Sequence, residues 1–115
     1  MPKSLKDDLQ ALEKVDLKAL SSLLGLKCSA TQEFIRFALA NALLFDRKML
    51  DYGPDNIGKF GVVGCVIRAS DKFERIAHLY KANRKKAANE SLQDSFRDIS
   101  NYMLIILMLE NGKWA

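Results

Sequence analysis

Apolar residues recur every three or four positions through most of the chain, and no segment shows the strict alternation of a confident β-strand. This spacing places apolar side chains on one face of an α-helix. The pattern predicts three principal helices, over residues 30–51, 63–81 and 90–111. We therefore expect an all-α fold, a single-domain helical bundle with an additional helical hairpin at its N-terminus.

The N-terminal hairpin is expected over residues 1–27, before a core bundle of residues 28–115. Ser4 and Asp7 have the spacing of a capping box, Asp16 can cap a second short helix, and Gly25 suits its end. The segment is rich in leucine: Leu5, Leu9, Leu12, Leu17 and Leu20. These side chains either cap the core or contact another subunit, and we favour a homo-oligomer.

Each principal helix has recognisable ends and an expected buried face. Ser29 with Gln32 marks the start of the first, Asn89 caps the last, and Gly112 ends it. The first helix is apolar over so broad a surface, Phe34 and Phe37 included, that we expect it to be central. The expected core face of the second is Val66, Ala69, Phe73, Ile76 and Tyr80. Beyond Tyr102 the last helix is apolar all round, which predicts burial.

Three glycines, Gly58, Gly61 and Gly64, lie at three-residue spacing around the start of the second principal helix. They do not form the dinucleotide-binding GxGxxG pattern, and no strand precedes them. Two interpretations remain: close packing of backbones, which we favour, or a loop that approaches a ligand.

Composition excludes several classes of protein. The chain has 115 residues, a net charge of +4 and two cysteines, Cys28 and Cys65, which form no CxxC pair and which we expect to be reduced core residues. The N-terminus has no apolar signal region, and the longest apolar run, residues 103–109, is too short to cross a bilayer. We expect a cytoplasmic protein with no membrane partner.

Three carboxylates, Glu90, Asp94 and Asp98, recur every fourth residue and would lie near one face of the last helix. Such a ridge is either a solvated face or a set of groups that meets cations. Because it leads into the apolar part of the helix, a cleft or a subunit contact is an alternative to the solvated face.

A basic stripe, Arg68, Lys72 and Arg75, runs along the preceding helix, beside a polar stripe of Asp71, Glu74 and His78. These residues either form ion pairs within and between helices or meet the phosphates of a ligand. His78 is the only histidine and is more typical of a surface residue than of an acid–base catalyst.

Further candidates flank these stripes. Tyr52 and Tyr102 can stack on a base, and Asn101 can bond to a base or ribose edge. A run of three cations, residues 84–86, is either a solvated loop or an additional attraction for phosphate. The basic residues are not interleaved with aromatic ones, so nucleic acid is not an expected partner.

The chain resembles a phage-associated family, the nucleotide modification associated domain proteins. The resemblance covers residues 45–109 and rests on three motifs: Asp51-Tyr52-Gly53, the segment 68–76, and Asn89-Glu90-Ser91 followed by Asp94, Asp98, Asn101 and Tyr102. This family is similar to the all-α MazG-like nucleotide pyrophosphohydrolases, in which acidic residues on two helices hold magnesium near a triphosphate.

The chain departs from the MazG-like pattern. Its earlier helix offers Asp71 and Glu74 among cations, and on the later helix Glu90 and Asp94 are four residues apart rather than three. Magnesium requires octahedral oxygen ligation, for which this set is incomplete. We therefore expect no catalytic residue, no metal ligand and no cofactor, with Mg²⁺ required only if the chain is an enzyme.

The resemblance favours a protein that binds a nucleotide, or sequesters a cyclic-nucleotide or ADP-ribose-derived immune signal as a phage anti-defence sponge. The expected ligand-binding residues are Arg68, Asp71, Lys72, Arg75, Glu90, Asp94, Asp98, Asn101, Tyr52 and Tyr102. One alternative is a Mg²⁺-dependent pyrophosphohydrolase that uses Asp71, Glu74, Glu90 and Asp94. Another is a helical adaptor that binds proteins through the leucine-rich N-terminus.

Overall fold

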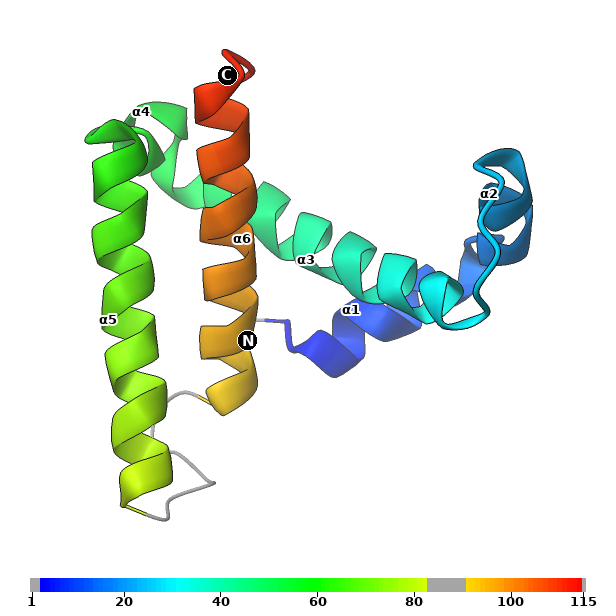
Figure 1. Ribbon diagram of the computed structural model, residues 1–115, viewed down its shortest axis with the longest axis horizontal. Helices are drawn as coiled ribbons and strands as arrows, with labels where there is room; N and C mark the ends of the chain where they lie inside the picture. The colour runs from blue at the N-terminus through cyan, green and yellow to red at the C-terminus, as the bar shows by residue number, and fades with distance from the viewer. Residues whose placement is uncertain (1–2, 83–90, 115) are drawn as a thin grey trace. The chain divides into compact units, whose positions relative to one another are not determined.

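The structure, a computed structural model, describes residues 3–82 and 91–114. These residues form six α-helices and one 3-10 helix, with no strand (Figure 1). The helices are α1 (Leu5–Ala11), the 3-10 helix η1 (Leu12–Lys14), α2 (Leu17–Leu23), α3 (Ala30–Tyr52), α4 (Pro54–Ile57), α5 (Gly61–Lys81) and α6 (Leu92–Glu110). The expected all-α helical bundle, with three principal helices and an N-terminal helical hairpin, is confirmed.

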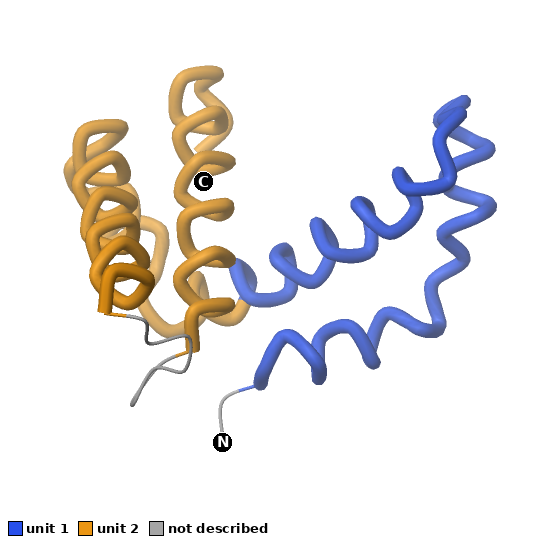
Figure 2. The backbone as a smooth tube through the Cα atoms, turned by 60° about the horizontal axis from the view of Figure 1, so that its bottom comes forward, with its two compact units in different colours: residues 1–46 blue, residues 47–115 orange. Residues whose placement is uncertain are grey.

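The contacts of the chain divide it into two compact units, residues 1–46 and residues 47–115 (Figure 2). The first unit contains α1, η1, α2 and most of α3, and the second contains the last turns of α3 with α4, α5 and α6. This boundary lies inside α3, whereas we expected a subdivision after residue 27. The count of domains stays a prediction.

The helices of the first unit begin where the sequence places their caps. The Ser4 hydroxyl accepts a hydrogen bond from the Asp7 amide at 3.2 Å, and the Ser4 amide donates to the Asp7 carboxylate at 2.9 Å. These bonds hold the pKa of Asp7 below its usual value. The Asp16 carboxylate caps α2 by accepting from the Ala19 amide at 2.9 Å. Gly25 follows α2 with a φ of +67°, a conformation that favours glycine.

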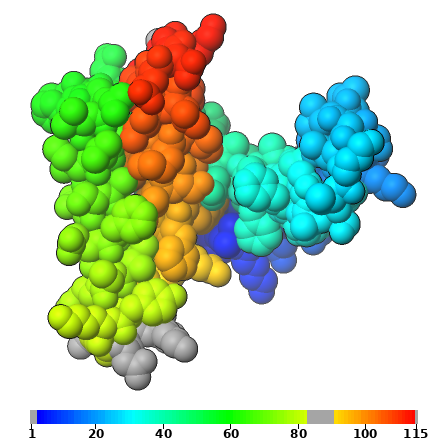
Figure 3. Space-filling view, viewed as in Figure 1, coloured from blue at the N-terminus to red at the C-terminus, as the bar shows by residue number. Residues whose placement is uncertain are grey.

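In the second unit, α5 and α6 lie side by side and run in opposite directions (Figures 1 and 3). The chain reaches α5 through a sharp turn after α3: Gly53 has a φ of +77°, and Pro54 is the first residue of α4. A proline is favourable there because the first helical residue needs no amide donor. Gly53 and Pro54 therefore separate α3 from the short helix α4.

The last principal helix begins two residues later than expected. Ser91 is its N-cap, and its hydroxyl accepts from the Asp94 amide at 3.2 Å while its own amide donates to the Asp94 carboxylate at 3.2 Å. This capping box fixes the start at Leu92. Asn89, the predicted cap, lies outside the described residues. Gly112 follows the helix end with a φ of +65°, as expected of a C-terminal glycine.

The predicted core face of α5 is largely wrong. Val66, Phe73 and Tyr80 are 51%, 57% and 56% exposed, whereas Ala69 is buried. The other buried apolar residues of α5 are Cys65 and Leu79. The helix carries two apolar stripes. The one that contains the small residues Cys65 and Ala69 faces the interior, because small residues allow two helices to approach closely.

Two further burial predictions are wrong in part, although Ile105 of α6 is buried as expected. Phe34 of α3 is 75% exposed and Phe37 is 45% exposed, although we expected a central helix. Leu104 and Leu107 in the apolar half of α6 are also exposed. Apolar character all round a helix does not bury it unless each face has a neighbour.

The three glycines at the start of α5 have separate roles: Gly58 precedes the helix, whereas Gly61 and Gly64 lie in its first turn. A Cβ on Gly58 would lie 2.5 Å from Nε1 of Trp114, whose indole donates to the carbonyl of Pro54 at 3.2 Å. Gly61 begins α5 with a φ of +61°, and a Cβ on Gly64 would lie 2.7 Å from Cβ of Phe60. Gly58 and Gly64 thus allow side chains to approach, which is neither the backbone packing nor the ligand loop that we considered.

We expect Gly58→Ala to displace the Trp114 indole, because the added methyl group overlaps its Nε1 atom. Trp114 is the only tryptophan, so tryptophan fluorescence comes from this side chain alone. The emission should shift towards that of a solvated indole, with a loss of about 1 kcal/mol of unfolding free energy. Lys81→Gln, at an exposed position of α5, is the control. An unchanged emission spectrum in Gly58→Ala would contradict the contact.

Candidate functional site

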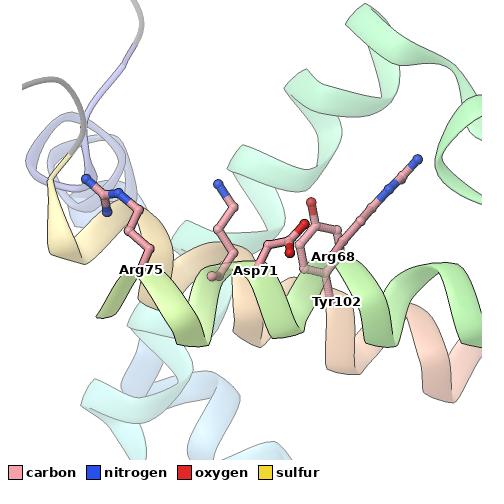
Figure 4. Close-up of a pocket in the computed structure, with 5 residues that line it drawn as sticks. Arg68, Asp71, Arg75 and Tyr102 are labelled. Carbon is pink, nitrogen blue, oxygen red and sulfur yellow. The ribbon is translucent and has the colours of Figure 1, made fainter. Parts of the chain in front are cut away.

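A pocket of about 390 Å³, open to one side, is lined by residues of α5 and α6 (Figure 4). Its lining residues are Arg68, Asp71, Lys72, Arg75 and Tyr102. The first four come from successive turns of α5, because steps of three and four residues keep side chains on one face of a helix. Tyr102 comes from α6, and with Asp71 it lies between the two arginines in the view of Figure 4.

The two arginines are held in place by protein groups. Arg68 donates to the carbonyl oxygens of Asn56 and Ile57, both at 3.3 Å, and so ties α5 to α4. Arg75 donates to the Ser95 hydroxyl at 2.6 Å and to the Ser91 carbonyl at 3.3 Å, at the first turn of α6. A guanidinium has five N–H donors, so an arginine can be anchored and still contact a ligand.

Lys72 is held by Asp98, a buried acidic residue of the predicted ridge. Its ammonium lies 3.1 Å from Oδ2 of Asp98, and the ammonium of Lys48, near the end of α3, lies 3.0 Å from Oδ1. The Asp98 side chain is only 7% exposed. The solvated-face interpretation is therefore wrong for Asp98, and the ion-pair interpretation of the basic stripe is confirmed for Lys72.

The electrostatic character of the pocket is cationic. Three of its lining residues are cations and one, Asp71, is a carboxylate. Asp71 is exposed, and Lys72 retains 24% of its side-chain surface although it is paired. Partly enclosed cations interact more strongly with an anion than cations in open solvent do, because less water screens them. The pocket is suited to an anionic ligand that also offers a donor to a carboxylate.

The structure brings together five of the ten residues predicted as a ligand site: Arg68, Asp71, Lys72, Arg75 and Tyr102. Asp98 pairs with Lys72 and is not among the lining residues, and Asp94 serves the cap of α6. Asn101 is buried, at 8% exposure, and does not line the pocket. Tyr52 is 59% exposed at the end of α3 and is not among the lining residues. Glu90 and the cations at 84–86 lie outside the described residues.

Sequence reasoning missed two residues that position the site, Lys48 and Ser95. Lys48 is 50 positions from Asp98, and no spacing rule joins residues so far apart. Ser95 has no distinctive signal either, although it is fully buried and accepts from Arg75. The only sequence feature that could have pointed to Ser95 is a small hydroxyl residue on the face of α6 that is expected to be buried, because a buried hydroxyl needs a hydrogen-bond partner.

The remaining chemical candidates do not join the pocket. Burial raises the pKa of the Cys65 thiol, so this cysteine is a neutral core residue, whereas Cys28 is exposed and was wrongly expected in the core. Both cysteines are free. His78 is exposed. Within residues 3–82 and 91–114, no three side chains of His, Cys, Asp and Glu are grouped so that they could hold a metal ion.

No family model, curated protein or solved structure matches this chain. The resemblance to the nucleotide modification associated domain proteins stays a prediction. Among the helices of the described segments, none has the length and apolar character needed to cross a membrane.

Asp98→Asn should lower the unfolding free energy by about 1–3 kcal/mol, because two ammonium groups lose their carboxylate partner. The loss is limited because both ammonium groups remain partly accessible to water. Urea denaturation measures the change. Glu74→Gln removes an exposed carboxylate from α5 and should change stability by less than about 0.5 kcal/mol. Equal effects of the two substitutions would contradict the structural importance of the Asp98 contacts.

Proposed function

We propose that this chain is a nucleotide-binding protein and that the pocket on α5 and α6 receives the phosphate groups of its ligand. The observation that carries the proposal is the set of three cations, one carboxylate and one aromatic ring lining a single pocket. Phosphates require cations, ribose and base edges offer N–H and O–H donors to a carboxylate, and a base stacks on a ring. The pocket thus contains groups suited to each part of a nucleotide.

Arg68, Lys72 and Arg75 are assigned to the phosphates, Asp71 to a ribose hydroxyl or a base N–H, and Tyr102 to stacking. Arg68 and Arg75 are seven residues apart on one helix, which separates their Cα atoms by roughly 10 Å. This spacing suits a ligand with more than one phosphate group better than a single phosphate. The pocket volume of about 390 Å³ lies within the range of small-molecule sites.

We propose further that the protein sequesters its ligand, a cyclic nucleotide or an ADP-ribose-derived immune signal, and acts as a phage anti-defence sponge in the host cytoplasm. The support is the motif resemblance together with the anchoring of each pocket cation by protein groups. Anchored side chains lose little freedom when a ligand binds, so affinity is gained without rearrangement. A homo-oligomer would carry several such pockets.

Isothermal titration calorimetry against a ligand panel tests the proposal. The panel contains cyclic dinucleotides, cyclic trinucleotides, cyclic ADP-ribose derivatives and nucleoside triphosphates, with the corresponding uncharged nucleosides as controls. At least one phosphorylated ligand should bind while its nucleoside does not, and affinity should fall as salt is raised. Silence across the whole panel would refute nucleotide binding.

For any ligand so identified, Arg68→Gln should raise Kd by about 10- to 100-fold, because one charge-assisted contact is lost. Tyr102→Ala should raise it by about fivefold or more through loss of stacking. Lys59→Gln is the matched control: Lys59 is an exposed cation of the same unit that does not line the pocket. If Lys59→Gln weakens binding as much as Arg68→Gln does, the attraction is general and the site assignment is wrong.

Recovery of the ligand separates sequestration from turnover. Heating the complex and analysing the released small molecule should return it chemically intact, with and without Mg²⁺. Pyrophosphate release that requires Mg²⁺ and disappears in Asp94→Ala would instead support the hydrolase.

A further inference from the structure

The outer side of α5 carries an apolar stripe that no other described helix of its own unit covers. Its six positions are separated alternately by three and four residues, and all six are exposed: Val63, Val66, Ser70, Phe73, Ala77 and Tyr80. Alternate spacings of three and four define the a and d positions of a heptad repeat, which places side chains along one seam of a helix. We call this set the α5 stripe.

The partner helix carries a second stripe of the same kind. Its members are separated by four, three and four residues and are also exposed: Phe96, Ser100, Met103 and Leu107. We call this set the α6 stripe. Neither stripe contains a charged residue.

Helix geometry places both stripes on one side of the α5–α6 pair. At about 100° per residue, the centre of the α5 stripe lies roughly 120° from the buried side marked by Cys65, Ala69 and Leu79. The centre of the α6 stripe lies roughly 120°, in the same rotational sense, from the side of Ser95 and Tyr102 that meets α5. Because the two helices are antiparallel, equal rotations in the same sense bring the stripes to a common face.

The pocket lies on the other side of the pair. Arg68, Asp71 and Arg75 are displaced from the buried side of α5 in the opposite rotational sense, by roughly 60° to 120°. The apolar face and the cationic pocket are therefore on opposite sides of α5, and a molecule that covers one leaves the other open.

The apolar face is too large to be ordinary exposed surface. Across the described residues, seven apolar residues are buried and seventeen large hydrophobic ones are exposed, and twelve of the exposed ones belong to the second unit. Phe73, Tyr80 and Phe96 are each about half exposed; at about 200 Å² per aromatic side chain they present roughly 300 Å² together. The aliphatic members of both stripes add further exposed apolar area. For comparison, a stable interface buries about 800 Å² on each partner.

We propose that this face binds the same face of a second copy of the chain, so that two α5–α6 pairs form a four-helix bundle. In such a bundle each pair supplies two helices whose a- and d-type residues meet in the centre. A two-fold symmetric contact requires a surface that complements itself. The small members, Ser70, Ala77 and Ser100, leave hollows beside Phe73 and Phe96, so the face contains both knobs and holes.

A second copy fits the face better than an unrelated partner. The occupant must be two helices wide and without charge along the seam, since an unpaired charge there would be buried. The chain's own α5–α6 face meets both requirements.

Sedimentation equilibrium or light scattering of the full-length chain tests the proposal first. The mass should be that of a dimer or a higher even assembly, an even multiple of 13.0 kDa, and should fall on dilution. A monomer at every concentration would overturn the proposal, whether the face stays bare or is covered by residues of the same chain.

Ala77→Glu tests the surface itself. Ala77 is exposed on α5, and glutamate is a good helix former, so the substitution leaves a single chain able to fold. It should raise the dissociation constant of the dimer by at least about 100-fold, because carboxylates would be buried against the partner seam. Phe73→Glu is a second variant with the same expectation.

Leu50→Glu is the matched control: Leu50 belongs to the same unit, is 81% exposed and lies in neither stripe. Its mass should equal that of the unsubstituted chain. Circular dichroism should show equal helix content in all three variants. If Ala77→Glu and Phe73→Glu remain assembled, or if Leu50→Glu dissociates equally, the proposed face is wrong. None of these measurements uses a ligand, so their outcome is independent of the proposed nucleotide site.

Discussion

The ion pairs of one buried carboxylate join three helices in the second unit of this protein. Asp98 of α6 is almost removed from water and is met by Lys48 of α3 and Lys72 of α5 at 3.0 and 3.1 Å. A carboxylate in such a place is tolerated only when cations or donors compensate for its lost hydration. The pairing therefore fixes the rotation of α6 about its own axis. Tyr102, one turn further along, is brought to the pocket by the same rotation.

The helix α5 presents a different chemistry on each of three sides. Small side chains, Cys65 and Ala69 among them, face the interior and allow α6 to approach closely. Three cations and Asp71 line the pocket on a second side. An uncharged apolar stripe occupies the third side. A single helix can combine these functions because its 3.6-residue period separates the three sets of side chains without interference.

The residues of the candidate site were predictable only in part. The spacing of Arg68, Lys72 and Arg75 correctly indicated a shared face, since it depends only on helix geometry. The same geometry indicated a shared ridge for Asp94 and Asp98, yet one caps its helix and the other is buried. Which carboxylate meets a cation depends on Lys48, which approaches from a distant part of the sequence.

The sequence by itself determined the all-α class, the approximate limits of the helices and their caps, because these depend on local spacing and on hydrogen bonds between residues a few positions apart. It did not determine which apolar stripe of α5 would be buried. Periodicity shows that a helix has a face of a given character, but not whether another helix lies against that face. Only the tertiary structure decided that α6 covers the stripe of Cys65, Ala69 and Leu79 and leaves Phe73 and Tyr80 exposed, since an apolar side chain is buried only where another helix lies against its face.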